Sequence, residues 1–413
     1  MHTLSSAQRV GTFRASYAQG LLTLALFFLP LGGPLQVYAE SSAGSGPTGA
    51  MAGDSKAVRP AMHEAYAAFR DLQKFIVSRQ RFQDPANAAE ITALMGTLKN
   101  SFHKVEETPT KLSSEPGFAS TLKVLNEMLS DAKQRFDEGK SGYALWRLKT
   151  AASHCVSCHT RHEVLIEFSD DSVGLGELSV LERGEFLLAT RQFQRAKETF
   201  KQAVLDPEGE PIRMSALRNW LLVFTRVEPN PDQALTELTH MLAKTTMRSY
   251  DREEIQSWIV SLRRWKGESK KFDIPVLKRA ENLIRQAVGA GDPISARIGT
   301  VELLRATALL HTLLEGNDVL GEGDRGYALY LLGLCYSELP SFFVVELPEM
   351  FLEQSIREVP SSETAQKSFA KYREVVTLGF TGSGGTRIPD DVLLKFKELH
   401  DIAHGTPALK ERV

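Results

Sequence analysis

The sequence predicts an all-α protein with two helical regions, and three observations lead to this prediction. Residues 59–168 contain four segments in which apolar residues recur every third or fourth position, the spacing of one face of an α-helix. Residues 176–405 continue this spacing in shorter segments arranged as helix pairs. A chain of 413 residues, 42% apolar and 24% charged, is long and apolar enough for each region to bury a core.

The N-terminus, residues 1–39, has the three parts of a secretory signal. Arg9 and Arg14 precede an apolar run over 21–31, and small residues follow around Ala39, after which we expect cleavage. The run is shorter than the roughly 20 apolar residues of a membrane-spanning helix. We therefore expect an exported protein, periplasmic in a bacterium, without a membrane span after cleavage; an uncleaved anchor is the alternative.

A flexible linker and four helices are expected next. Residues 40–58 are rich in Ser, Gly and Ala and have too little apolar content to fold on their own. Pro60 is expected to begin the first helix, because a proline in the first turn loses no helical hydrogen bond. The helices are expected from Pro60 to Asp84, over 86–105, from Phe118 to Gly139 and from Ser141 to His162. Their short connections predict an up-down bundle over 59–168, in which inward-facing side chains hold any cofactor.

From about residue 176 the pattern changes to helical pairs. One unit places small, aromatic and terminating residues at or within one residue of their positions in a tetratricopeptide repeat: Gly184, Phe193, Ala196, Phe200, Ala203 and Pro207. Gly184 would let two antiparallel helices approach closely while Phe200 fills the groove between them. Such a unit cannot bury its face alone, so neighbouring pairs are required.

Less regular helical segments are expected to follow. They lie over 213–225, 232–242, 251–266, 275–288, 295–315 and 349–358. Gly333 is typical of the first helix of a further repeat, and Ala365 with Phe369 of its second helix. The closing helix is expected to turn four apolar residues inward: Val392, Leu393, Phe396 and Leu399. The concave face of such a repeat domain usually binds an extended or helical segment of a partner protein.

One motif carries the chemistry, the C-x-x-C-H run from Cys155 to His159 near the end of the fourth helix. This run is the attachment signature of c-type haem. Because an α-helix turns about 100° per residue, Cys155, Cys158 and His159 lie within roughly a 100° arc of its surface. Both thiols can then reach one edge of the porphyrin while His159 binds the iron. We expect one covalently bound haem c.

The motif has three alternative interpretations. A thioredoxin-like dithiol requires a βαβ context, which the pattern lacks. A zinc site could combine Cys155, Cys158, His159 and His162, but one helix cannot wrap four ligands tetrahedrally around a metal. A chance match is the third. Cys335 lies in an apolar helical run and is expected to be a small buried thiol, so no structural disulfide is expected.

A four-helix bundle with this motif near the end of its last helix resembles cytochrome c′ and its low-spin class II relatives, over residues 59–168. The resemblance implies an antiparallel bundle, His159 as the proximal ligand, and a distal ligand or blocking residue from the first helix. The sequence differs from the family pattern just after the motif. Family members often place an aromatic and then a basic residue there, whereas this chain has Thr160-Arg161-His162-Glu163.

The distal side of the iron decides the function. Met62 lies on the apolar stripe of the first helix, in the region from which low-spin relatives supply a methionine, so it is the tentative distal ligand. The alternatives are an open iron beside Tyr66 and Phe69, or ligation by His63, which lies about 100° off the stripe. His154 is expected at a solvated helix position.

The leading function is an electron-transfer module joined to a protein-docking scaffold, with a redox partner protein or a peptide segment on the repeats. The alternatives are a five-coordinate haem sensor or gas-binding protein, and an assembly adaptor with structural haem. An electron carrier or binding protein is favoured over an enzyme, because no distal acid–base pair is identifiable. The net charge of −2, from 49 basic and 51 acidic residues, disfavours a nucleic-acid partner.

Overall fold

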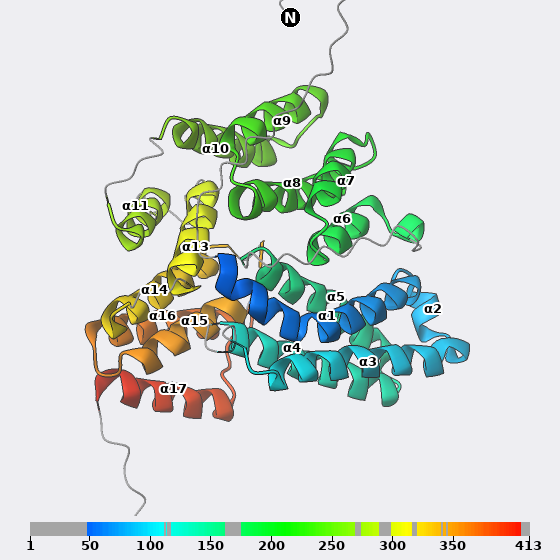
Figure 1. Cartoon of the computed structure of the whole chain (residues 1–413), viewed down its shortest axis with the longest axis horizontal. Coiled ribbons are helices and arrows are strands. Elements are labelled where there is room, and N and C mark those ends of the chain that lie inside the picture. Colours follow the sequence, from blue (N-terminus) through cyan, green and yellow to red (C-terminus); the bar gives the residue numbers. More distant parts are fainter. Residues whose placement is uncertain are drawn as a thin grey trace, which may run out of the picture. The chain divides into compact units, whose positions relative to one another are not determined.

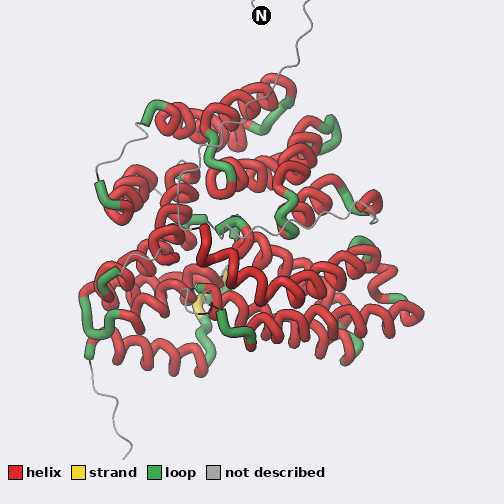
Figure 2. Tube along the Cα trace, in the orientation of Figure 1, coloured by secondary structure: helices red, strands yellow, loops and turns green. Residues whose placement is uncertain are grey.

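The chain is all-α, with about 15 helices packed as sequential antiparallel pairs (Figure 1). A computed structural model describes residues 48–110, 113, 117–161, 175–268, 274–288, 299–315, 320–339, 342–343 and 346–405. Helices account for 82% of the described residues, and the strands form one small hairpin (Figure 2). The all-α prediction is confirmed. Within the described ranges, no helix is long and apolar enough to cross a membrane. The predicted signal lies outside them.

The first five helices are α1 (Thr48–Ile76), α2 (Arg79–Gln83), α3 (Ala88–Glu107), α4 (Phe118–Asp137) and α5 (Ser141–His159). They share one apolar core, to which α2 adds the fully buried Phe82. Gly139 has a φ of 77° just after α4, so it ends that helix as predicted. The helix that carries the motif ends at His159 rather than continuing to His162, which lies outside the described residues.

The first helix differs from its prediction at both ends. It begins at Thr48, within the predicted linker, and Pro60 lies in its interior. Val58 is buried in the first core, so the apolar face of the helix starts before the proline. The helix ends at Ile76 because the Ser78 side chain accepts a hydrogen bond from the backbone N–H of Arg81 and begins α2.

The next helices are α6 (Val180–Ala189), α7 (Phe193–Leu205), α8 (Arg213–Leu222), α9 (Pro231–Lys244), α10 (Ser249–Lys266), α11 (Val276–Val288), α13 (Thr300–Glu315), α14 (Glu322–Ser337) and α15 (Glu346–Glu358). A second core runs through them. In the pair α6 and α7, Gly184 faces the ring of the fully buried Phe200, and a Cβ at this glycine would overlap that ring. The close approach predicted for Gly184 and Phe200 is therefore present.

Short helical turns lie between these helices along the chain: 3-10 helices at Pro85–Asn87 before α3, Leu175–Glu177 before α6 and Glu210–Ile212 before α8, and a π-helix at Val223–Val227 that extends α8. Cys335 is buried on α14, as expected.

One helix pairing differs from its prediction. Gly333 on α14 packs against Leu352 on α15, where an added Cβ would lie 2.5 Å from the Leu352 Cγ, so α15 rather than the segment with Ala365 and Phe369 covers it.

The chain ends with α16 (Glu363–Gly379), the hairpin of β1 (Thr381–Gly382) and β2 (Gly385–Thr386), and α17 (Asp390–His404). A third core joins α15, α16 and α17. Phe396 and Leu399 are buried there as predicted, but Leu393 is 47% exposed. This part of the prediction is wrong because α17 packs through a narrow face. The buried Phe396, Leu399 and Ala403 lie within about 60° of one another around the helix, and Leu393 lies outside this arc, about 120° from Leu399.

Candidate functional site

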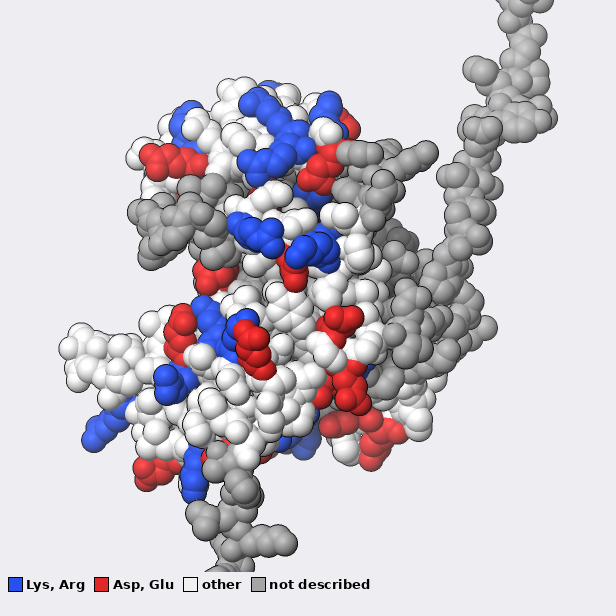
Figure 3. Space-filling view, turned by 90° about the vertical axis from the view of Figure 1, so that its left-hand side faces the viewer, with Lys and Arg blue, Asp and Glu red and all other residues white. Residues whose placement is uncertain are grey.

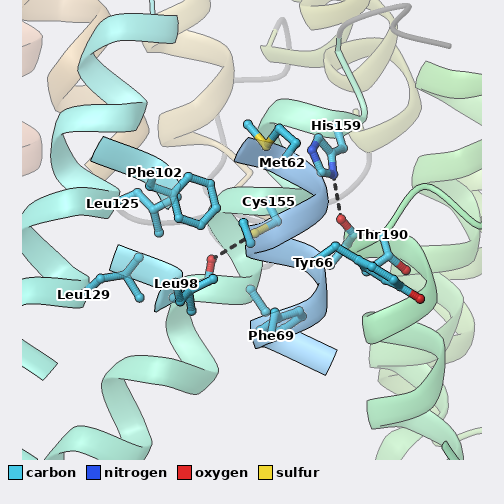
Figure 4. A pocket seen from close by; sticks show the side chains of 14 residues that line it. Met62, Tyr66, Phe69, Leu98, Phe102, Leu125, Leu129, Cys155, His159 and Thr190 are labelled. Carbon is cyan, nitrogen blue, oxygen red and sulfur yellow. Dashed lines mark hydrogen bonds between the residues drawn. The ribbon is translucent and has the colours of Figure 1, made fainter. Parts of the chain in front are cut away.

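An apolar pocket lies among helices α1, α3, α4 and α5 and is closed by the end of α6 (Figure 4). The empty space among its side chains is about 470 Å³, including the part that is open to solvent. Its lining consists of Met62, Ala65, Tyr66, Phe69, Leu98, Phe102, Leu125, Leu129, Ala151, Ala152, Cys155, His159, Ala189 and Thr190. The structure thus brings Met62, Cys155 and His159 to one pocket.

His159 is oriented by a backbone contact from outside the first core. Its Nδ1 lies 2.6 Å from the carbonyl oxygen of Ala189, the last residue of α6 (Figure 4). A carbonyl only accepts hydrogen bonds, so Nδ1 carries the proton and Nε2 carries the lone pair. Histidines that bind metals usually donate their second ring N–H in this way. The imidazole is therefore held in the tautomer that a metal ligand needs.

The two motif cysteines are half-buried and pack against the first core. Cys155 lines the pocket, and its thiol donates to the Ala151 carbonyl oxygen at 3.7 Å. Cys158 is not among the lining residues. Burial raises the pKa of the Cys155 thiol to about 12, with a smaller contribution from Cys158. Redox-active dithiols instead have a lowered pKa, so this environment disfavours thiol–disulfide chemistry.

Helix α1 supplies the wall of the pocket that carries the residues predicted for the distal side of the iron. Met62, Tyr66 and Phe69 all line it. Figure 4 shows Met62 and His159 at the same end of the pocket, with Phe69 at the other. His63 is exposed and is not a lining residue. Of the three distal alternatives, the structure therefore places the methionine and the aromatic residues at the site.

The contribution of α6 was not predicted. Phe186 stacks on Phe69, with ring centroids 5.5 Å apart, and Ala189 and Thr190 line the pocket. The next residue, Arg191, is 7% exposed and has a φ of 62°, a left-handed conformation that is strained for a residue with a Cβ. Burial lowers the pKa of Arg191 to about 10, and the nearby Cys158 opposes this shift. The spacing of residues within one helix cannot predict these contacts, because they join α6 to residues of α1 and α5.

His154 differs from its prediction. It is 1% exposed, and neither ring nitrogen has a hydrogen-bond partner. Burial lowers the pKa of His154, the charge of Glu346 on α15 raises it and that of Arg147 lowers it. The predicted solvated position is wrong, because His154 is buried in the folded chain and the charge of Glu346 on α15 acts on it.

The described residues hold no group of three or more His, Cys, Asp or Glu side chains arranged to bind a metal ion. His162, the fourth ligand of the zinc alternative, lies outside them. Comparisons with family models, with curated proteins and with solved structures find no match to this chain.

Proposed function

We propose that this protein is an exported c-type cytochrome with one covalently bound haem, which transfers electrons. Cys155 and Cys158 would form the thioether bonds, and the Nε2 of His159 would bind the iron. The observation that carries the proposal is the position of the C-x-x-C-H motif: Cys155 and His159 both line one apolar pocket inside the helices of the first core.

The lining suits a haem. Its side chains are almost all apolar, which matches the porphyrin faces, and Phe69, Phe102 and Tyr66 supply aromatic surface. When bound, haem supplies one-electron redox chemistry. The chain's own residues have three tasks around it: the cysteines anchor the ring, the Ala189 carbonyl fixes the tautomer of His159, and the apolar walls exclude water.

We also propose the finer architecture. The packing of α1, α3, α4 and α5 around one core supports a cytochrome c′-like four-helix bundle. The close contacts of Gly184 with Phe200 and of Gly333 with Leu352 support tetratricopeptide-like pairs, because small residues at these positions let paired helices approach. Export to the periplasm rests on the signal pattern in residues 1–39.

Docking of a partner protein is proposed on the repeats. An open groove there is lined from α11, α13, α14 and α16. Tyr327 and Tyr330 stack in it with ring centroids 6.0 Å apart, and Lys367 and Lys371 lie along its wall. On the side of the molecule where α11 and α14 lie, basic and acidic side chains are interspersed (Figure 3). A partner segment with aromatic and charged groups suits such a surface better than a uniformly charged polymer.

A five-coordinate haem protein that binds a gas is the second candidate. Tyr66 and Phe69 line the pocket from α1 and are bulky enough to occupy the distal side without binding the iron. Met62 lines the same pocket and favours the six-coordinate electron carrier. The absorption spectrum of the reduced protein with and without carbon monoxide separates the two. A low-spin spectrum that carbon monoxide leaves unchanged supports electron transfer, and ready binding supports the sensor.

The first test of the proposal is covalent haem. The full chain is produced in a host with a c-type haem maturation system and analysed by intact mass and by pyridine haemochrome. We expect a mass increase of one haem and the spectrum of a porphyrin joined by two thioethers. Cys155→Ser and Cys158→Ser should each lose one thioether, while Cys335→Ala, at a thiol buried elsewhere, should keep both. Wild-type protein without covalent haem would contradict the proposal.

A further inference from the structure

A second cavity lies beside the first, between α1, α5 and α6. It measures about 720 Å³ with its open part, and Phe69 and Ala152 line both cavities. Its remaining lining residues are Gln73, Ile76, Val77, Leu148, Lys149, Leu178, Glu182, Glu185 and Phe186. Its walls are therefore mostly apolar, with a few polar groups at defined places, which is the usual construction of a small-molecule site.

The polar groups of this second cavity are mainly hydrogen-bond acceptors. The Gln73 side chain is 8% exposed and donates its amide Nε2 to the Phe69 carbonyl oxygen at 3.1 Å, which leaves its Oε1 as an acceptor. Glu185 is half-buried, and its carboxylate forms no hydrogen bond or ion pair with any described residue. A ligand that fills the cavity must therefore bring donors.

Among the described residues that line this cavity, Lys149 is the one basic residue, and it is already paired with a carboxylate. Lys149 Nζ lies 3.1 Å from Glu182 Oε1, and the other Glu182 oxygen accepts from the Ser179 hydroxyl at 2.7 Å. Glu182 also completes the N-terminal capping box of α6, which holds it in place. Because Lys149 and Glu182 form an ion pair, their charges cancel. Glu185 is then the only charged residue among those lining the cavity that has no oppositely charged partner in the described part of the chain.

The protonation of Glu185 responds to this environment. Burial raises the pKa of Glu185 to about 7; Glu182 on the same helix adds to the shift, and Lys149 on α5 opposes it. Helix α1 faces the cavity with Phe69, Gln73 and Ile76, none of which titrates. A cationic ligand stabilises the carboxylate, so ligand binding and ionisation of Glu185 are coupled near neutral pH.

We propose that this second cavity binds a small aromatic primary amine. The ring would pack against Phe69 and Phe186, which already stack at 5.5 Å and 17° and so present aromatic surface. The ammonium group would donate to the Glu185 carboxylate and to the Gln73 Oε1. The proposal does not rest on the haem. Gln73, Glu185 and Phe186 line the second cavity and not the first, and of the residues that it uses only Phe69 lines both.

Titration calorimetry of the full chain with benzylamine tests the proposal. The affinity should rise about tenfold between pH 6 and pH 8, because a carboxyl with a pKa near 7 goes from mostly protonated to mostly ionised over that range. Glu185→Gln should weaken binding roughly tenfold to hundredfold and remove the pH dependence. Glu198→Gln, the same change at an exposed position on α7, should bind as the wild type does.

Two further ligands define the chemical class. Benzyl alcohol keeps the ring but lacks the charge and should bind at least about tenfold more weakly than benzylamine. Benzoate carries the opposite charge and should not bind. Benzylamine affinity unchanged in Glu185→Gln, or equal affinity for benzyl alcohol, would overturn the proposal, as would no binding of benzylamine. The double variant Cys155→Ser, Cys158→Ser repeats the titration without covalent haem, so failure of the haem proposal is recognised separately.

Discussion

The Nδ1 of His159 lies 2.6 Å from the carbonyl oxygen of Ala189, and this hydrogen bond joins the motif helix α5 to the first helix of the following pair, α6. The contact gives α6 two roles at once. It is one half of a helix pair with α7, and it orients the residue proposed to bind iron. A displacement of α6 would therefore reach His159 directly.

His159→Asn separates the two proposed functions of His159, the hydrogen bond to Ala189 and the binding of iron. The asparagine Nδ2 occupies roughly the position of the histidine Nδ1 and can still donate to Ala189, but nothing replaces Nε2. We expect His159→Asn to lose iron coordination while the free energy of unfolding of the haem-free chain stays within about 0.5 kcal/mol. His159→Ala should lose about 1 kcal/mol as well, because it removes the hydrogen bond. Equal unfolding midpoints in urea for the two variants would contradict this assignment.

Met62 should be the distal ligand if the protein carries electrons. We expect the reduced wild-type protein to be six-coordinate and low-spin, and Met62→Ala to become five-coordinate and bind carbon monoxide. His63→Ala is the matched control, because His63 is adjacent in sequence but exposed and outside the pocket. The measurement is the absorption spectrum with and without carbon monoxide. An unchanged spectrum in Met62→Ala removes Met62 as the ligand.

Sequence spacing predicted those features of the fold that depend on neighbouring residues. The positions of the helices follow from apolar periodicity, and Gly184 with Phe200 follows from the spacing of a small and an aromatic residue in one repeat unit. The convergence of Met62 and His159 on one pocket was also expected, through the family resemblance. The first two expectations rest on spacing within one helix or one helix pair, and the third rests on the resemblance.

Contacts between distant segments were not predictable in this way. His154 is polar and next to Cys155, so the sequence alone favours a solvated position, yet the folded chain buries it and brings the charge of Glu346 on α15 to act on it. Glu185 looks like an ordinary charge on an amphipathic helix, and only the approach of α1 and α5 makes it a cavity residue. Such contacts depend on which helices meet, and the periodicity of one helix carries no information about its partner.

Gly184→Ala should destabilise the α6–α7 pair. A Cβ at this position would overlap the Phe200 ring, whose own burial is complete, so the ring cannot move into open space. Overpacking of this kind costs about 1–3 kcal/mol. Gly379→Ala, at a helical glycine with open space around it, should leave the unfolding midpoint unchanged or slightly raise it. Urea unfolding measures both, and equal midpoints would show that the α6–α7 contact is looser than described.

Arg213 should be among the most sensitive positions of helices α6 to α15. Its guanidinium is buried and donates to four backbone carbonyls, those of Val204, Asp206, Pro207 and Thr246, at 2.7–3.1 Å. These bonds connect the end of α7 with the turn after α9. Arg213→Met should cost about 3 kcal/mol or more, because it removes four hydrogen bonds donated by a buried charged group. The exposed Arg252→Met is the control, and a loss below about 1 kcal/mol at Arg213 would contradict the prediction.

His154 should make stability depend on pH. Burial lowers its pKa below the ordinary 6.5, so in mildly acidic solution the unfolded chain binds a proton that the folded chain does not. Stability is then fully present above about pH 6.5 and falls as the pH drops below it. Between pH 7.5 and pH 5.5 we expect the wild type to lose about 1 kcal/mol more than His154→Phe, measured by urea unfolding. His240→Phe, at an exposed histidine, should follow the wild-type curve. Parallel curves for the wild type and His154→Phe would contradict this prediction. They would mean that His154 binds a proton in the folded chain as readily as in the unfolded chain, which requires the protonated ring to pair with the neighbouring Glu346 carboxylate.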